Sequence, residues 1–489
     1  MTRKLIAIAM ASLALSACGG DSDSPPPQLT SATTVTGPIT GFGSVIVNGV
    51  KFDDSNATVT MDGALATRDR LRLGMVVQIR GRIGNDGTGV ADDIRYDNCV
   101  EGPITAMNRV QNTVTVMGQT VHVDDGTVFD GVTLRDMNSF AIGDVVEVSC
   151  MQDPISNRLQ ATRMERTGSF ANGATEVGVA GAVSNLNAAA GTCTIGGLTV
   201  NFAGIAAADR PAGLANGMNV EAVGRNFANG ILTADRLRDR DRDRIHTPDG
   251  DGLQVEGYVS DFVSIASFKV DGQLVNAANA TVKNGTAADI RNSLRIEVEG
   301  TMTSGTLVAS VVVIKLQTNV RVEAGMQAKD AAQSTITLLG RAIRVTADTR
   351  VTDRLASHHQ PKAITLAALN FADRLEVMAY KDAGGNLVAT QVERTEADPL
   401  VVVRGAAEAK TPITRMTLAG FAVDTGTYTR YRDESGNLVD AATFYNAVQV
   451  PPAVPTMVHA RGVVANLGAT VVDATRAVST IGELELGDN

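Results

Sequence analysis

The sequence predicts an all-β protein made of about six small tandem modules, each a five-stranded β-barrel. Three observations predict this fold. A phrase of the form Gly-Asp-x-Val-x-Val-x-Gly returns about once every 65–90 residues, an alternating apolar and polar hairpin precedes it, and a strand with a recurrent alanine follows it. The repeated residues are strand and turn formers, so the repeat predicts architecture and no reaction.

The Gly-Asp-x-Val-x-Val-x-Gly phrase predicts one half-buried strand in each module, because its branched residues alternate. Four copies are clear and two are looser; they begin at Gly74, Gly143, Gly217 and Leu294, and at Asp373 and Met457. Each module opens on Val-x-Gly or a variant of it, at Val35, Val100, Val179, Val255, Val322 and Val403.

Between the opening strand and the Val-x-Val strand lies the hairpin. The segment 113–123 shows it best, with alternation on both sides of Gly118, and the same turn recurs at Gly49, Gly197, Gly272, Gly340 and Gly420. The final strand carries an alanine, at Ala91, Ala161, Ala234, Ala309, Ala389 and Ala474. Five antiparallel strands of this kind can close into an oligonucleotide/oligosaccharide-binding (OB-like) barrel, and a two-sheet sandwich is the alternative.

The repeat sets the expected organisation of the chain. The six modules are expected at 33–98, 99–168, 176–238, 253–317, 319–397 and 399–486. A charged linker at 239–252 divides them into two halves of three, and the last module carries an insertion at 426–455. Modules of this size are near the lower limit for independent stability, so we expect each to be stabilised by contacts with its neighbours.

The openers, the Gly-Asp-x-Val-x-Val-x-Gly phrase and the alanine strand together resemble the domain-of-unknown-function 5666 family. The resemblance is good over 33–317 and looser afterwards, where the fifth module has Ala379 in place of the closing glycine. It implies tandem copies in a bacterial lipoprotein. The resemblance implies a fold architecture and a cellular location, but the family has no established activity.

The N-terminus predicts export and a lipid anchor. Residues 1–17 have a short basic start and an apolar stretch, which is typical of a secretory signal peptide. The stretch ends Leu15-Ser16-Ala17-Cys18, which resembles the bacterial lipoprotein signal with Cys18 as the acylated residue; a chance cysteine is the alternative. By resemblance to the bacterial sorting rule, Gly19 favours the outer membrane. Residues 18–32 form a polar, proline-containing tether.

Composition argues against nucleic acid. The chain has 43 basic and 53 acidic residues and a net charge of −10, whereas phosphate backbones attract clustered Lys and Arg. Trp is absent and aromatic residues make up 4% of the chain. This scarcity also disfavours sites that stack sugars or bases on aromatic rings.

Two cysteines of the second module are expected to form a disulfide. Cys99 opens the module and Cys150 replaces the glycine that ends the Val-x-Val strand elsewhere. In a five-stranded Greek-key barrel the first and fourth strands are neighbours, so the two side chains could meet; two buried thiols are the alternative. Cys193 is expected to be a small buried side chain on a hairpin strand.

No metal, cofactor or catalytic site is predicted. Asp239, Asp241 and Asp243 alternate, but Arg244 and Gly250 occupy the positions where a calcium loop needs glycine and glutamate. His358-His359 is a pair of adjacent residues that point apart, so a metal would need further ligands from elsewhere. The sequence contains no nucleophile elbow, zinc-protease or phosphate-loop motif.

The insertion at 426–455 is the candidate binding loop, because tyrosine and arginine are the residues that dominate interface energetics. Its candidate residues are Tyr428, Arg430, Tyr431, Arg432, Phe444 and Tyr445. The alternative is a loop that covers one end of a barrel. We therefore expect a non-catalytic envelope lipoprotein that acts as a tandem-module scaffold or spacer. Its expected partners are the membrane, through the lipid, and a protein or glycan of the envelope. An envelope enzyme that uses carboxylates in one module cleft, or a surface adhesin, is the alternative.

Overall fold

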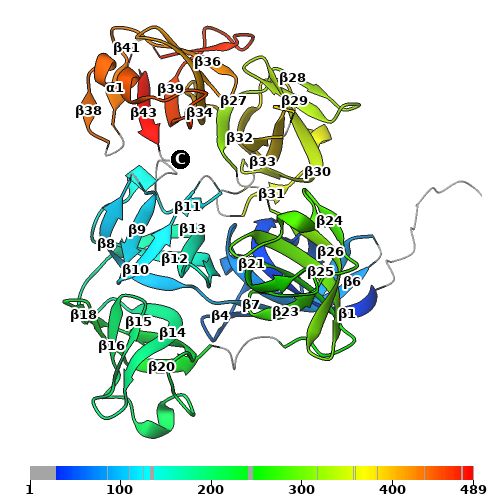
Figure 1. Cartoon of the computed structure of the whole chain (residues 1–489), viewed down its shortest axis with the longest axis vertical. Coiled ribbons are helices and arrows are strands. Elements are labelled where there is room, and N and C mark those ends of the chain that lie inside the picture. The colour runs from blue at the N-terminus through cyan, green and yellow to red at the C-terminus, as the bar shows by residue number, and fades with distance from the viewer. Residues whose placement is uncertain are drawn as a thin grey trace, which may run out of the picture.

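The computed structural model describes residues 29–489 except 85, 110, 125, 133–136, 241–245, 316–317, 356, 358–359, 383, 434–435, 475–476, 479 and 488–489. Over this range the protein is all-β, with a single α-helix, α1 (Ala441–Ala447), among the described residues (Figure 1). Short 3-10 turns precede the Val-x-Val strands of five modules: η1 (Arg68–Arg70), η2 (Met137–Ser139), η3 (Ala207–Asp209), η4 (Ala287–Asp289) and η5 (Leu366–Ala368).

The first module is a closed barrel of five strands. Its ring runs through β1 (Leu29–Gly41), β2 (Val45–Val47), β3 (Val50–Asp53), β7 (Thr88–Tyr96) and β6 (Val76–Gly84), and β6 pairs back to β1. This is the OB-like strand order. The β3–β7 pair is parallel, so the expectation of a wholly antiparallel barrel was wrong at this pair. Also pairing in parallel with β7 is β4 (Thr58–Met61), which forms a hairpin with β5 (Ala64–Ala66).

The second and fourth modules repeat this ring. The second contains β8 (Val100–Asn108), β9 (Thr113–Val116), β10 (Gln119–His122), β11 (Val128–Asp130), β12 (Asp144–Asp153) and β13 (Arg158–Ser169). The fourth contains β21 (Gly252–Ser264), β22 (Ser267–Val270), β23 (Gln273–Asn276), β24 (Thr281–Lys283), β25 (Arg295–Thr303) and β26 (Thr306–Ile314). In both, the second hairpin strand closes the ring in parallel with the alanine strand.

In each of the remaining three groups of strands, one strand of the barrel ring is interrupted. In the third, the alanine strand breaks at Ala234; its strands are β14 (Val177–Asn187), β15 (Thr192–Ile195), β16 (Leu198–Asn201), β17 (Asn219–Gly224), β18 (Asn226–Ala228), β19 (Ile231–Thr233) and β20 (Arg236–Asp239). In the fifth, the opener is split; its strands are β27 (Val320–Gly325), β28 (Ala328–Asp330), β29 (Thr335–Leu338), β30 (Arg341–Asp353), β31 (Lys362–Ala363), β32 (Arg374–Lys381) and β33 (Leu387–Thr395).

In the sixth group the alanine strand stops after Ala474 and resumes as β43. Its strands are β34 (Val401–Thr411), β35 (Arg415–Leu418), β36 (Phe421–Asp424), β37 (Arg430–Arg432), β38 (Leu438–Val439), β39 (Met457–Gly462), β40 (Val471–Asp473), β41 (Ala477–Val478), β42 (Thr480–Ile481) and β43 (Glu483–Gly487). The helix α1 lies in the sequence where the other modules have their 3-10 turn.

The two glycines that recur in each module have separate physical roles. In the fourth module the hairpin turns on Asp271-Gly272, with φ of 48° and 79°, which is the tight hairpin turn that needs positive φ at both positions. The opener glycine, Gly257, lies under this turn, and a Cβ there would be 3.2 Å from the Cβ of Asp271. The opener glycine therefore makes room for the first side chain of the turn.

The modules join through their opening strands. In the second and third modules, β8 pairs antiparallel with β14 and Val100 lies opposite Val179. In the fifth and sixth, β27 pairs antiparallel with β34 and Val322 lies opposite Val403. Paired residues in antiparallel strands point to the same face, so each couple of modules shares one continuous hydrophobic core. We call these couples the double barrels.

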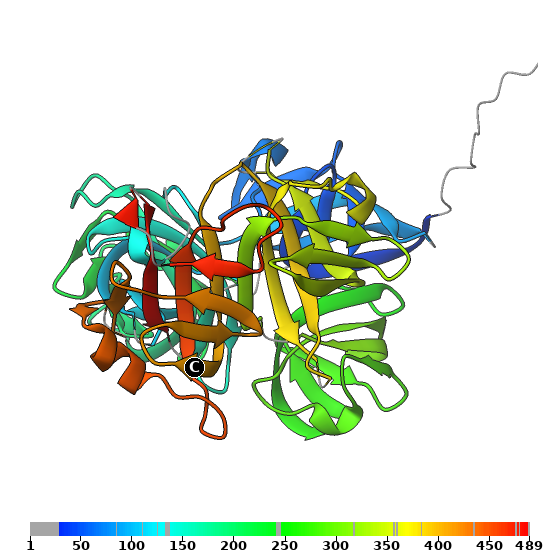
Figure 2. The same cartoon turned by 90° about the horizontal axis from the view of Figure 1, so that it is seen from above.

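The first and fourth modules are joined differently. Their openers β1 and β21 pair in parallel, and Val35 lies beside Gln254 while Thr36 lies beside Val255. A shift of one residue turns a side chain to the other face of a sheet. The two barrels therefore lie on opposite faces of the shared sheet and keep separate cores. Figures 1 and 2 show the result, in which the modules pack side by side in one body.

Candidate functional site

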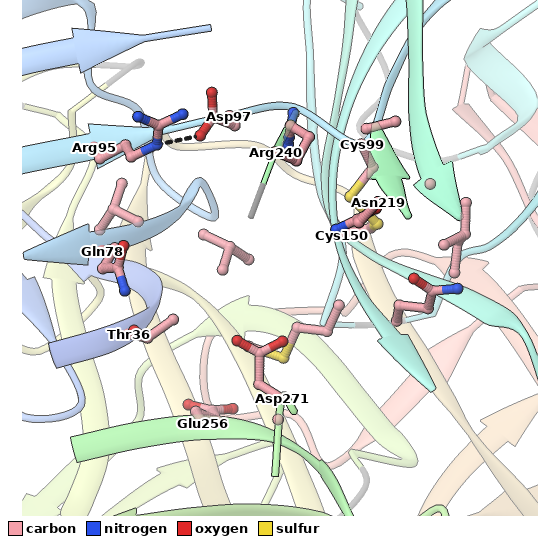
Figure 3. Close-up of a pocket in the computed structure, with 18 residues that line it drawn as sticks. Thr36, Gln78, Arg95, Asp97, Cys99, Cys150, Asn219, Arg240, Glu256 and Asp271 are labelled. Atoms are coloured by element: carbon pink, nitrogen blue, oxygen red, sulfur yellow. Dashed lines mark hydrogen bonds and ion pairs between the residues drawn. A yellow bond between two sulfur atoms is a disulfide. The ribbon is translucent and has the colours of Figure 1, made fainter. Parts of the chain in front are cut away.

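A cavity of about 200 Å³ lies where the first four modules meet (Figure 3). Its lining includes Thr36 and Gln78 of the first module, the two cysteines of the second, Asn219 of the third and Glu256 of the fourth. The polar positions lie on the outer faces by which the modules pack together, and the two cysteines pack against the core of the second module. The cavity is thus a product of module assembly and does not belong to any one barrel.

The wall from the first module is a polar row across three strands. Thr36 on β1 lies opposite Gln78 on β6, and Gln78 lies opposite Arg95 on β7. The neighbouring Val35 and Ile79 point the other way and are fully buried in the barrel. The two-residue period of the strand therefore delivers the polar row to the cavity.

Ion pairs tie the first module to the third at the edge of the cavity. Arg95 Nε contacts Asp97 Oδ2 at 2.6 Å, and Arg238 Nη2 contacts Asp97 Oδ1 at 3.2 Å and Glu221 Oε2 at 2.6 Å. Arg240 Nη1 donates to the carbonyl of Asn98 at 3.0 Å. Arg238 and Arg240, at the start of the charged segment, are thus structural, because they fix the third module against the first.

The fourth module supplies acidic groups on the other side of the cavity. Glu256 on β21 pairs with Arg295 at 2.7 Å and with Lys315 at 3.5 Å. Burial alone would raise the pKa of Glu256, but Lys315 and Arg295 outweigh burial and hold it below its usual value. Asp271 reaches the cavity from the hairpin turn. Figure 3 shows Arg95 and Arg240 on one side and Glu256 and Asp271 on the other.

A disulfide joins Cys99 to Cys150 and forms part of the cavity wall (Figure 3). The two cysteines meet because β8 and β12 are neighbours, with Val100 opposite Val148. This is the adjacency of first and fourth strands from which the sequence predicts the bond. Cys193 is a buried free thiol, and burial raises its pKa.

The candidate binding loop is divided by the structure. Tyr431, Phe444 and Tyr445 are 4%, 0% and 3% exposed and belong to the core of the last double barrel. Their rings pack in tilted and edge-to-face pairs, with the Tyr431 and Phe444 centroids 5.1 Å apart. Tyr431 is buried because β37 pairs in parallel with β43, so this part of the supposed insertion is a barrel strand. The expectation of an aromatic surface loop was wrong for these three residues.

The other members of the loop remain near the surface. Tyr428 is 65% exposed and Arg430 is exposed. Arg432 is half-buried, and its Nε contacts Glu483 Oε2 at 2.9 Å. A single exposed tyrosine and one arginine are a much smaller binding surface than the sequence suggests.

Several predicted residues fall outside the described range. Cys18, Asp241, Asp243, His358 and His359 are among them. Among the residues that the structure describes, no group of three or more His, Cys, Asp or Glu side chains is placed to hold a metal ion. The described part of the chain also contains no helix that is both long and apolar enough to cross a membrane.

The cavity itself was not predicted from the sequence. Its polar residues are outward-facing strand positions, which look like ordinary solvated faces until the module contacts are known. The only sequence signal was the charged alternation around Arg238 and Arg240, which the linker interpretation treated as solvated.

Comparison with known protein families agrees with this architecture. The family model described as "Domain of unknown function (DUF5666)" matches four segments that cover just over half of the chain, at 34–95, 101–165, 256–313 and 321–393. The chain belongs to the DUF5666 family. The matched DUF5666 segments are the first, second, fourth and fifth modules, and the third and sixth lie outside them. Each unmatched group is the second member of a double barrel. No curated protein matches the chain.

Proposed function

We propose that this DUF5666 protein is a non-catalytic, lipid-anchored scaffold of the bacterial cell envelope that holds a partner at a fixed geometry. The observation that carries the proposal is the pairing of opener strands between modules. Strand pairing and shared cores fix the modules relative to one another, which favours a scaffold over a flexible spacer.

The anchor would attach through the first module. Residues 18–28 precede β1, and an extended chain of that length reaches about 35 Å at most. The last described strand, β43, belongs to the sixth module, which Figure 1 shows beside the second module and away from β1. The attachment point would therefore lie nearer to the first module than to the sixth.

Cys18→Ala tests the anchor. The variant should lose acylation and leave the membrane fraction at high salt, because the lipid is the proposed attachment. Gly19→Ala serves as the matched control and should remain acylated. Membrane retention of unacylated Cys18→Ala would contradict the proposal.

Crosslinking in intact cells, followed by pull-down of the anchored protein, tests the scaffold role. One envelope protein or glycan should be recovered from wild-type cells and lost when the crosslinker is omitted. Protease added to intact cells separates an inward-facing scaffold from an adhesin, because only an outward-facing chain is cut. A protein that yields no partner in repeated crosslinking would not be a scaffold.

An enzyme is the second candidate, and the carboxyl pair of Glu101 and Glu147 favours it. The two residues lie directly opposite each other on β8 and β12. Burial and the nearby acids raise the pKa of Glu101 to about 7, which suits a general acid. Hydrolysis of chromogenic glycosides that disappears in Glu101→Gln would support this role, and absence of any hydrolysis would remove it.

A further inference from the structure

We propose that one end of the second barrel, at Met107 and Ile142, docks an extended segment of a partner protein. We call this end the open corner. The inference rests on the proposed function, since it names the surface by which a scaffold would hold its partner. It is carried by the first module, where the equivalent corner already holds an extended segment of this chain.

The corner can be located in every module by the backbone hydrogen bonds between the opener and the start of the Val-x-Val strand. In the second module the N–H of Gly143 donates to the carbonyl of Ile104, and the residue just before this glycine is the corner residue. The corner residues of the six modules, in chain order, are Leu73, Ile142, Asn216, Asn292, Phe371 and Val454. The apolar ones of the second, fifth and sixth modules are 69%, 69% and 72% exposed, whereas Leu73 is 1% exposed.

At the corner of the first module lies the strap, residues 360–363 of the fifth module. The N–H of Phe42 donates to the carbonyl of Pro361 at 3.0 Å, and the N–H of Ala363 donates to the carbonyl of Phe42 at 2.6 Å. The Nε2 of Gln360 donates to the carbonyl of Leu71 at 2.9 Å, where the 3-10 turn η1 ends. The strap therefore binds in extended form, by backbone pairing and by a side chain that caps the turn.

The third and fourth modules close the same corner with a polar side chain of their own. Asn216 Oδ1 accepts the N–H of Leu186 at 2.9 Å, and Asn292 Oδ1 accepts the N–H of Phe262 at 3.0 Å. Leu186 and Phe262 occupy the position that Phe42 has in the first module. The carbonyl of the strap thus takes the place of the corner asparagine in a module whose corner residue is apolar.

The fifth and sixth modules cap the turn with a lysine at the position of Phe42. Lys329 Nζ donates to the carbonyl of Leu369 at 2.6 Å, and Lys410 Nζ donates to the carbonyl of Val448 at 2.6 Å. The second module has Met107 at this position, and a thioether has no N–H or O–H to donate. The open corner is therefore the one that joins an exposed apolar corner residue to a side chain that cannot cap the turn.

The chemistry of the strap defines the occupant. An extended segment adds main-chain hydrogen bonds to an existing strand end, and its side chains give specificity. The segment we infer belongs to an envelope protein and carries a glutamine or lysine next to a small apolar residue. Its donor side chain caps the turn η2, and its apolar side chain covers Ile142, which burial removes from water.

Fluorescence anisotropy of the full chain in detergent tests the inference with a labelled, acetylated strap peptide, Gln-Pro-Lys-Ala-Ile-Thr, as the probe. We expect saturable binding. The same peptide with leucine in place of glutamine should bind about fivefold more weakly, because the turn loses its hydrogen-bond donor.

Two variants locate the site. Ile142→Ser should weaken binding of the strap peptide about tenfold, because an apolar anchor is lost. Ile155→Ser is the matched control: Ile155 is 50% exposed in the turn between β12 and β13 of the same module, so the peptide should bind this variant normally. Thermal unfolding of both variants checks that the fold is kept, as expected for exposed positions.

The inference is overturned if the strap peptide gives no saturable binding, or if Ile142→Ser and Ile155→Ser bind it alike, as they would if the peptide only displaced the strap from the first module. Wild-type dimers that Ile142→Ser dissociates in sedimentation would make a second copy the occupant and would also overturn it. The scaffold role is judged separately by crosslinking in cells. A captured partner without peptide binding removes only the open corner, whereas peptide binding without any partner keeps the corner and removes the scaffold.

Discussion

Glu101 in β8 lies directly opposite Glu147 in β12, so two carboxyl groups occupy neighbouring places on the outer face of the second barrel. The hydroxyl of Tyr96, from the first module, donates to Glu147 Oε1 at 2.7 Å. Burial raises the pKa of both groups. For Glu101, the charges of Glu147, Asp62, Glu176 and Glu165 raise it further, to about 7. Ionised carboxylates at the junction between these modules are therefore unfavourable at neutral pH.

This pair predicts that stability falls as pH rises from about 4.5 to about 7. The folded protein binds a proton at Glu101 that the unfolded chain has already lost in this window, so the free energy of unfolding decreases with pH. Glu101→Gln should reduce this dependence, with the part due to Glu147 remaining, and should stabilise the protein at pH 8 by about 1–2 kcal/mol, less than full conversion of the shift because the side chain is partly solvated.

Urea unfolding at pH 5 and pH 8 measures the effect. Glu299→Gln, at an exposed position on β25, is the control and should show the wild-type pH profile. A Glu101→Gln variant that is less stable than wild type at pH 8 would mean that the carboxylate is held by favourable contacts.

The double barrels should unfold as units. Leu232 is fully buried in the core shared by the second and third modules, and Leu232→Ala should cost about 2–5 kcal/mol. Hydrogen exchange should then accelerate in both modules. Leu307→Ala is the matched change in the separate core of the fourth module and should leave exchange in β2 and β3 unchanged. Acceleration confined to the third module would show that the shared core does not couple the two barrels.

The disulfide should carry a large part of the stability of the second module. Its cysteines are 51 residues apart, and closing a loop of that length is worth about 4 kcal/mol in the chain-entropy treatment. Cys99→Ala combined with Cys150→Ala should lower the free energy of unfolding by about 2–4 kcal/mol. Non-reducing peptide mapping of protein from the native compartment should show the Cys99–Cys150 link, and a link to Cys193 would contradict it.

The aromatic cluster of the sixth module should be structural. Tyr431→Ser or Phe444→Ser removes a buried ring and should cost about 3–5 kcal/mol, measured by thermal or urea unfolding. Tyr428→Ser, at an exposed ring, should change stability by less than about 0.5 kcal/mol. If the two buried positions tolerate serine without loss, the ring contacts between Tyr431, Phe444 and Tyr445 do not hold the barrel closed.

The barrel fold could be predicted because local sequence patterns specify its strands. Alternation around Gly118 and the phrase at Gly143 each specify a strand without knowledge of any partner. The pairing of modules could not be predicted from the sequence, because it depends on the register between distant strands. Val35 and Val255 look equivalent in the sequence, yet a one-residue offset in their pairing separates their cores.

Only part of the candidate site could be predicted from the sequence. The disulfide followed from the strand adjacency within one module. The cavity required the third and fourth modules to be placed against the first, and nothing near Asp271 or Arg240 in the sequence indicates that both line one cavity. The aromatic loop was misjudged because Tyr431 lies on the short strand β37 while Phe444 and Tyr445 lie on α1, so the sequence does not show that these rings pack together.

The parallel contact between β1 and β21 also sets a condition on how the chain reaches its native state. Paired residues such as Thr33 and Gly252 are about 220 residues apart. This separation slows folding, because the chain loses the entropy of closing a long loop before the contact can stabilise it. A chain that is synthesised N-terminus first would keep one side of β1 without its neighbour until the fourth module emerges. An unpaired strand edge favours pairing with another chain, so nascent intermediates that end before Gly252 should be the species most dependent on chaperones.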